Sequence, residues 1–222
     1  MDAESSAENV LHLALGLGLN AGEQKFFSSE GDERDTHMDP RDALREEHGA
    51  TMKMLATLQR FIAKVVDLKE GETKDLKALI EFFEIYVDRY HHGKEEQVLF
   101  PALSRVRTAR IDALINSLME DHREARTSME QIESNAVTLH SCSEADRDEF
   151  RERADRYVDL VKKHIRKENS ELLPLIEERL SETERLQMAG QFYDVEKATL
   201  GSSGLEVFLV SVRRFSQKYT PL

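Results

Sequence analysis

The sequence of 222 residues contains one cysteine, Cys142, and no tryptophan. A single cysteine cannot form an internal disulfide, and it excludes an iron–sulfur cluster or a zinc site built from cysteines of this chain. Glycine and proline are scarce, at 10 and 4 residues, whereas charged residues make up 33% of the chain. This balance favours long helices over a sheet. We therefore expect an all-α protein in a reducing compartment, with the cytoplasm as its location.

Long apolar runs and an excess of basic residues are also missing. The main apolar stretch, residues 10–19 (VLHLALGLGL), has about half the length that a membrane helix needs. The acidic start, MDAESSAEN, lacks the basic segment of a secretory signal. The formal net charge is −12, and binding to phosphates or anionic lipids requires a basic surface. We expect neither a membrane nor a nucleic acid as a partner, and no protein partner can be named.

An acidic extension is predicted over residues 1–37. It carries eight acidic and two basic residues, so that its charge of −6 is half of the net charge of the chain. Residues 5–19 have the composition of a short amphipathic helix, and the rest resembles a solvated linker. We expect the extension to be partly helical or disordered and to dock loosely or not at all. The alternative is a segment that binds a partner or forms a dimer.

Apolar residues at spacings of three and four predict four long helices. The first begins at the Asp39–Pro40 pair, an N-cap acid followed by proline, and the second is expected to bend at Pro101. Long helices with short connections run antiparallel to their neighbours, which predicts an up-down-up-down antiparallel four-helix bundle over residues 38–180. The expected helices span residues 40–67, 72–104, 109–139 and 144–180.

A further helical segment follows the bundle. Ser181 and Glu184 have the spacing of a capping box for a fifth helix over residues 182–199. A last helix is expected over residues 205–218. We therefore predict that residues 181–222 pack on the outside of the bundle as an additional C-terminal helical segment.

One motif occurs twice. The segments HHGKEEQVLFPAL, from His91, and HIRKENSELLPLI, from His164, share the pattern His-x-x-x-Glu-x-x-x-Leu-x-Pro at an offset of 73 residues. Aligning the two prolines pairs Glu95 with Glu168. The second copy therefore selects one histidine and one glutamate from the two of each that the first copy offers.

Another histidine precedes each copy on the previous helix. His48 lies 43 residues before His91, and His122 lies 42 residues before His164. Each leading histidine falls in the apolar stripe of its predicted helix and directly follows an acid. The chain is thus predicted to form two helical hairpins of one design, each contributing His…His-x-x-x-Glu to the core.

These six groups are expected in one layer of the bundle. At a rise of about 1.5 Å per residue, the leading histidines and the two glutamates fall within roughly one helical turn of the same depth. A lone histidine on an apolar face is usually an ordinary core residue, but six ionisable groups are costly to bury without compensation. A metal removes that cost because it replaces water as their partner. The predicted metal ligands are His48, His91, Glu95, His122, His164 and Glu168.

Imidazole and carboxylate donors without thiolate suit iron. Two equivalent halves suggest two iron ions, each bound by two histidines, with the two glutamates bridging. Manganese or a mixed iron–manganese pair is the alternative, and zinc fits less well because it prefers four-coordinate sites.

These motifs resemble those of the hemerythrin-like (HHE cation-binding) family. The matching segments are EEH ending at His48, HHGKEEQVLFPAL, EDHREAR around His122 and HIRKENSELLP, within residues 38–180. The resemblance implies a non-haem di-iron centre in a four-helix bundle that binds O₂ or related small molecules, with the six residues above as ligands. The invertebrate oxygen carriers have an extra histidine and an aspartate, so this set is closer to the bacterial and sensor-type branch.

His92 and Glu96 repeat the motif one position further round the helix. Their stripe would contain Ile85, Asp88 and Arg89 and is more polar. We expect His92 and Glu96 to support the ligands from outside or to face solvent, with a ligand role as the alternative.

The leading functional hypothesis is reversible binding or sensing of O₂, peroxide or nitric oxide. Apolar side chains are expected to limit proton access to the bound molecule, namely Met52, Phe83, Met129 and Leu172. Candidates for hydrogen bonds to it are Tyr86, Tyr90 and Tyr157. The alternatives are an oxidase or peroxidase-type enzyme, and an iron-dependent switch whose acidic tail recruits a partner.

Overall fold

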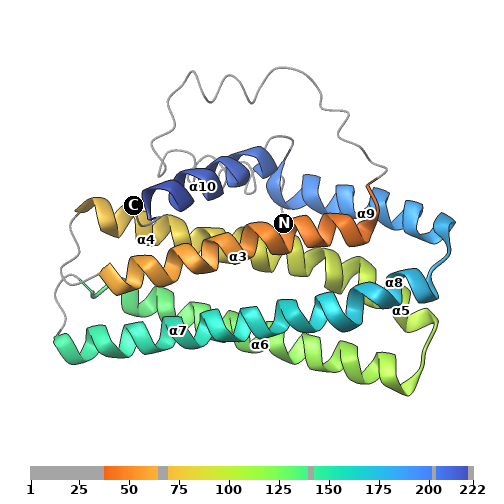
Figure 1. The fold of residues 1–222 in the computed structure, drawn as a ribbon, viewed down its shortest axis with the longest axis horizontal. Coiled ribbons are helices and arrows are strands. Elements are labelled where there is room, and N and C mark those ends of the chain that lie inside the picture. The colour runs from red at the N-terminus through yellow and green to blue at the C-terminus, as the bar shows by residue number, and fades with distance from the viewer. Residues whose placement is uncertain (1–37, 65–69, 140–142, 202–203, 220–222) are drawn as a thin grey trace.

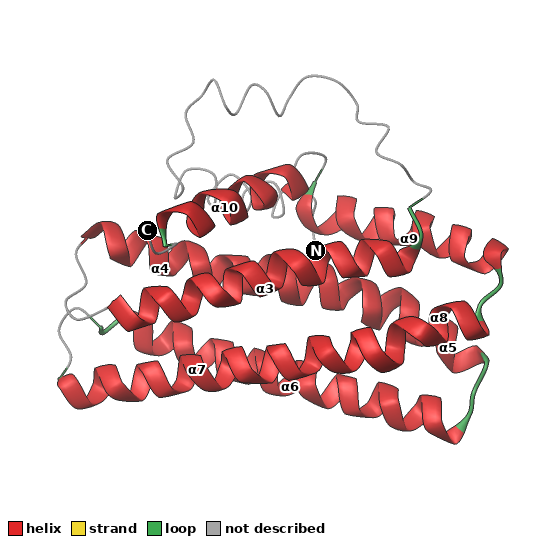
Figure 2. Ribbon diagram, viewed as in Figure 1, coloured by secondary structure: helices red, strands yellow, loops and turns green. Residues whose placement is uncertain are grey.

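The computed structural model describes residues 38–64, 70–139, 143–201 and 204–219. The predicted extension, residues 1–37, lies outside these ranges, as does Cys142. Within them every regular element is a helix, which confirms the all-α prediction for the part described (Figure 2). None of these helices combines the length and apolarity that crossing a membrane requires.

Four long helical runs lie lengthwise beside one another, and each runs opposite to the one before it (Figure 1). Their bounds lie within a few residues of those expected. The first and third runs are single helices, α3 (Pro40–Lys64) and α6 (Ala109–Ala136). The second consists of α4 (Glu70–Glu81), η1 (Phe82–His92), η2 (Glu95–Leu99) and α5 (Phe100–Arg105), and the fourth of α7 (Glu144–Lys167), η3 (Glu168–Leu172) and α8 (Leu173–Arg179).

The segments η1, η2 and η3 are π-helical, with wider turns than an α-helix. The N–H of Phe100 donates to the carbonyl of Glu95, and the N–H of Leu173 donates to that of Glu168, each five residues back. In both repeats a proline follows directly. Proline has no N–H to donate, and its ring clashes with the carbonyl of the residue four positions before it. A π-helical turn therefore lies directly before Pro101, where the sequence predicted a bend, and such turns are often found at functional sites.

The apolar core is divided into two clusters. Along the helices the change from one cluster to the other occurs at a buried histidine or glutamate. Leu44 and Leu118 belong to the smaller cluster and lie one turn before His48 and His122, while Ala125 belongs to the larger one. A layer of buried polar side chains thus separates the two halves of the core.

One expected core residue is exposed. Met52 is 38% exposed, whereas Thr51 and Met54 are almost fully buried. A helix advances 3.6 residues per turn, so the core position after His48 falls between residues 51 and 52. Thr51 occupies it, and Met52 cannot shield the centre as predicted.

Two further helices, α9 (Glu182–Leu200) and α10 (Gly204–Lys218), pack against α3 and η1 on one side of the bundle (Figure 1). The capping box predicted at Ser181 is present, because its hydroxyl accepts from the N–H of Glu184 and its N–H donates to the Glu184 carboxylate. Gly201, with a φ of 71°, ends α9 in a conformation that favours glycine. Phe208 and Val212 of α10 extend the larger cluster.

Away from the polar layer, Glu84 offers a test of the packing between η1 and α6. Burial and the neighbouring Glu133 raise the pKa of Glu84 from 4.5 to about 7. Between pH 4.5 and about 7 the folded state then binds more protons than the unfolded state. The free energy of unfolding therefore falls as the pH rises through this range. Because Glu84 is partly exposed, we expect Glu84→Gln to stabilise the protein by only about 1–2 kcal/mol at pH 8, and hardly at pH 4. Urea unfolding at both pH values measures this, with Glu130→Gln, an exposed neighbour on α6, as the control. An equal effect at both pH values would contradict the assignment.

Candidate metal centre

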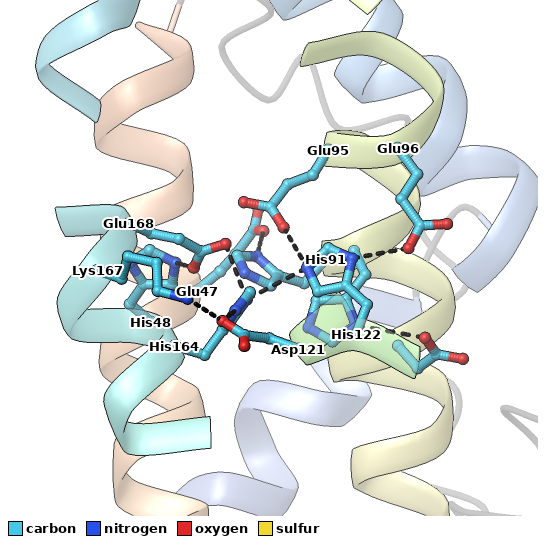
Figure 3. Close-up of polar contacts among 12 residues, drawn as sticks. Glu47, His48, His91, Glu95, Glu96, Asp121, His122, His164, Lys167 and Glu168 are labelled. Atoms are coloured by element: carbon cyan, nitrogen blue, oxygen red, sulfur yellow. Dashed lines mark hydrogen bonds and ion pairs between the residues drawn. The ribbon is translucent and has the colours of Figure 1, made fainter. Parts of the chain in front are cut away.

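Seven ionisable side chains from all four helical runs meet in the polar layer. Figure 3 labels all of them except His92. Each is at most 4% exposed. They include all six residues predicted from the sequence and one more. They are His48 from α3, His91 and His92 from η1, Glu95 from η2, His122 from α6, His164 from α7 and Glu168 from η3.

The donor atoms form two groups of four that share both glutamates. His48 and His91 make up the first group with Glu95 and Glu168, and in each group the donors lie within 4.8 Å of one another. The second group consists of His122 and His164 with the same two glutamates. Two carboxylates common to two pairs of imidazoles are suited to bridging two ions.

The inward atoms of the first group lack hydrogen bonds. Nε2 of His48, Nε2 of His91 and both carboxylate oxygens of Glu95 and Glu168 are buried without a hydrogen-bond partner. Imidazole nitrogens nevertheless lie close to these oxygens: His48 Nε2 is 3.0 Å and His164 Nε2 is 2.8 Å from Glu168, and His122 Nε2 is 3.3 Å from Glu95. None of these contacts has the geometry of a hydrogen bond. Unsatisfied buried polar groups are rare and costly. These residues therefore fit a metal ion, which would accept all of those lone pairs.

The outer nitrogens of the histidines, in contrast, are all bonded. Each Nδ1 faces a side-chain oxygen, which favours the tautomer with hydrogen on Nδ1 and a free lone pair on Nε2. The partners are Asn169 for His48 (3.0 Å), Glu47 for His91 (2.8 Å), Asp88 for His92 (3.3 Å), Glu96 for His122 (2.7 Å) and Asp121 for His164 (3.3 Å).

The acids that precede the leading histidines hold the second histidine of their own hairpin. Glu47 contacts His91, and Asp121 contacts His164. Each acid is in turn bound by a lysine. Lys94 donates to Glu47 at 2.7 Å, and Lys167 of the fourth helical run donates to Asp121 at 2.5 Å.

These two lysines extend the sequence repeat. Each stands three residues after the histidine and directly before the glutamate of its motif, in HHGKE and HIRKE. Sequence reasoning missed both, although the shared lysine was a usable signal. The repeated unit is therefore acid-His…His-x-x-Lys-Glu, and it encodes the supporting contacts as well as the donors.

A third cation supports the imidazoles of His92 and His122. Nε of Arg126 lies 2.6 Å from Asp88 Oδ1, and its Nη2 lies 2.6 Å from Glu96 Oε1. Those two carboxylates hold His92 and His122, whose rings stack with centroids 3.8 Å apart. One guanidinium thus fixes both stacked rings.

Charge balance follows these contacts. Burial opposes ionisation of Glu47, but Lys94 and the hydrogen bond from His91 lower its pKa to about 2. Burial likewise opposes protonation of His164, but Glu168 and Asp121 raise its pKa to about 10. Protonated imidazole therefore balances the inner carboxylates when no metal is bound, and a metal must displace those protons.

The expectation that His92 faces solvent is wrong. His92 is 2% exposed and joins His122 and His164 in a third group of convergent donors. The reason is the π-helical backbone of η1, which turns through fewer degrees per residue and brings adjacent side chains onto one face. Burial and the neighbouring imidazoles hold the pKa of His92 well below its usual range, so it is neutral and its lone pair is free. Glu96 contacts Nδ1 of His122. This agrees with the expectation that Glu96 supports a ligand from outside.

Of the three tyrosines expected to face a bound ligand, two are engaged elsewhere. The hydroxyl of Tyr90 lies 3.0 Å from Glu47 and 3.1 Å from Glu196, outside the ring of histidines. Tyr86 stacks on Phe82 in the larger cluster. Tyr157 remains near the centre, because it lines a cavity that His92 also lines.

That cavity, of about 170 Å³, opens between η1 and α6. Its lining includes Phe83, Ala125, Arg126 and Met129 besides His92 and Tyr157. It is smaller than a typical site for an organic substrate, which measures about 300–1,000 Å³. Only a small molecule fits beside the centre at this point.

A family model agrees with this architecture. The hemerythrin HHE cation binding domain matches residues 39–176, more than half of the chain. The chain belongs to the hemerythrin HHE family. Domains of this family bind metal cations, and the buried His/Glu clusters of this member supply suitable donors.

Several relatives match the chain at low identity. The uncharacterized protein Rv1995 of Mycobacterium tuberculosis is 19% identical over 206 residues, which cover 93% of this hemerythrin-like chain and 80% of the relative. The protein Mb2018 of Mycobacterium bovis gives the same values. A DNA nickase of Nostoc sp. is 27% identical over 157 residues, covering 70% of this chain and 38% of that protein.

The buried Lys94 provides a test of the supporting shell. Replacing Lys94 with methionine leaves the Glu47 carboxylate buried without its cation, so we expect a loss of about 3–5 kcal/mol in the free energy of unfolding. Adding Glu47→Gln removes the uncompensated charge and should recover part of the loss. Urea unfolding measures both, with Lys53→Met, an exposed lysine on α3, as the control. A loss below about 1 kcal/mol would show that the pair carries little of the packing at this site.

Proposed function

We propose that this hemerythrin-like protein holds two iron ions and reversibly binds O₂ or a similar small molecule, such as peroxide or nitric oxide. His48 and His91 would hold one ion, His122 and His164 would hold the other, and both ions would share Glu95 and Glu168. His92 would be an additional donor to the second ion. Manganese in one or both positions is the alternative metal content.

The sharing of both glutamates between two groups of donors carries this proposal. A single ion would leave one pair of imidazoles and at least one carboxylate oxygen buried without a partner. Two ions use every inward donor. A mixed nitrogen and oxygen donor set is one that iron accepts, with coordination positions left open. When bound, the ions supply the electrons and the open position that a small oxidising ligand needs.

The residues of the chain have three tasks in this function. The outer acids and Asn169 fix the orientation of the imidazoles by holding their Nδ1 hydrogens. The two apolar clusters above and below the layer keep water and protons away. The cavity beside His92 admits only a small ligand, past Tyr157 and Met129.

Metal content and reversibility test the proposal together. Purified protein reconstituted with ferrous iron without oxygen is expected to hold two ions per chain by elemental analysis. Addition of O₂ should change the ultraviolet-visible spectrum, and removal of O₂ under vacuum should restore it. Irreversible oxidation with turnover would favour the oxidase alternative over reversible binding. Fewer than two ions per chain would contradict the two-ion assignment.

The cavity beside His92 gives a separate prediction. Ala125 is 7% exposed and lines it, so Ala125→Leu would fill part of its volume. We expect the association rate of azide with the oxidised iron-loaded protein to fall at least tenfold, at unchanged iron content. Stopped-flow absorbance measures the rate, and Ala113→Leu, at an exposed position of the same helix, is the control. An unchanged rate would show that small ligands enter by another route.

A further inference from the structure

An apolar groove lies on the opposite side of the first hairpin from that cavity. It is bounded by α3, η1, α9 and α10 and has a volume of about 330 Å³. Six large apolar side chains of the described residues are exposed, and three of them line this groove. They are Met38, Tyr193 and Leu209, at 40%, 38% and 38% exposure. Exposed apolar side chains gathered at one hollow indicate a binding surface rather than scattered surface residues.

The floor of the groove leads to the metal centre. Glu47, Tyr90, Lys94 and Glu196 all line it. Lys94 donates to Glu47 and to the hydroxyl of Tyr90, at 2.7 and 2.6 Å, and Glu47 holds His91. The polar contacts that orient one histidine of the centre therefore lie directly beneath an apolar surface that the other described residues leave exposed.

The chain itself supplies a segment with matching chemistry. Residues 10–19 (VLHLALGLGL) carry leucine at five alternate positions, and no charged residue occurs between Glu8 and Glu23. Met38, the first residue that the structure describes, is itself part of the groove wall. We propose that residues 10–19 dock in this groove and cover the Glu47–Lys94 contact.

Tether length favours the chain's own segment over a second copy. Eighteen residues, 20–37, join the apolar segment to Met38. A flexible tether of that length has a root-mean-square span of about 21–25 Å, which reaches every part of a groove that begins at its attachment point. Such a tether gives an effective concentration of order millimolar, well above a micromolar concentration of free protein.

Docking would give the acidic extension a role that the metal centre does not require. It would remove the apolar wall from water and shield the contacts to His91 on the side where α9 and α10 lie. Docking or release of residues 10–19 would thereby change the surroundings of His91.

The absence of tryptophan makes a direct test simple. In the full chain, Leu15→Trp introduces a single reporter within the apolar segment. We expect blue-shifted emission and at least threefold slower quenching by acrylamide than for the same reporter in urea. Adding Leu209→Asp in the groove should shift the emission to that of exposed tryptophan. Adding Leu186→Asp, at a residue that is 50% exposed on α9 and outside the groove wall, should leave it unchanged.

A second measurement does not depend on fluorescence. With Cys142→Ser, the pair Leu15→Cys and Leu209→Cys is expected to form an intramolecular disulfide under mild oxidation, and Leu15→Cys with Leu186→Cys is not. An exposed reporter, or one that Leu209→Asp leaves unchanged, would overturn the proposal. Burial that depends on protein concentration would assign the groove to a second copy and overturn it as well. Burial of a Phe27→Trp reporter with exposure of the one at position 15 would assign the groove to another part of the extension.

Discussion

Replacing Glu168 with alanine is expected to leave the protein with one bound iron ion or none. Its carboxylate belongs to both groups of donors, and both of its oxygens are buried without a hydrogen-bond partner. Loss of a group that only supports a ligand typically lowers metal affinity by 10–100-fold, so loss of a shared ligand should cost about a hundredfold or more. Elemental analysis after dialysis measures the iron content per chain.

Glu171→Ala is the matched control for this change. Glu171 lies on the same π-helical segment but is exposed. It should retain two ions. If Glu168→Ala also retained two tightly held ions, the bridging role of Glu168 would be wrong, whatever its effect on stability.

Removal of the metal ions is expected to lower the melting temperature by about 8–16 °C. A ligand present at a thousand times its dissociation constant stabilises the folded state by about 4 kcal/mol, and a protein of this size shifts by about 2–4 °C per kcal/mol. The direction follows from the buried donors, because without metal both glutamates depend on protonated imidazoles such as His164 for compensation. Calorimetry of iron-loaded and chelator-treated protein, both kept without oxygen, makes the comparison.

The Glu168→Ala variant separates metal loss from other effects of the chelator. With little iron to lose, it should show a much smaller shift on the same treatment. A shift below about 2 °C for the unmodified protein would mean that the metal contributes little to folding, and that the buried polar layer is stable by itself.

The helices and the convergence of the six predicted side chains were predictable because the sequence repeats. A single copy of the motif offered two histidines and two glutamates, and the copy at His164 selected between them. The helix limits were predictable from local chemistry, since Asp39–Pro40 and the capping box at Ser181 stand at the observed starts. Periodicity then placed His48 and His122 on core-facing stripes.

The errors arose where the backbone departs from an α-helix or where a polar residue fills the core. The wide turns of η1 bring His92 inward beside His91, and a period of 3.6 residues cannot anticipate this. Thr51 occupies the position assigned to Met52, because a search for apolar residues passes over a buried threonine. The supporting role of Arg126 depends on packing between η1 and α6, which only the folded chain reveals.

The division of the apolar core into two clusters affects cooperativity. In most small domains one continuous core makes unfolding an all-or-none event. Among the described residues a layer of ionisable side chains separates the two clusters, so bound ions would join two packing units that are otherwise separate. Without metal, we expect the end of the bundle that contains Leu44, Leu118 and Ile176 to open locally while the larger end stays folded. The metal would then set how much of the protein unfolds as one unit.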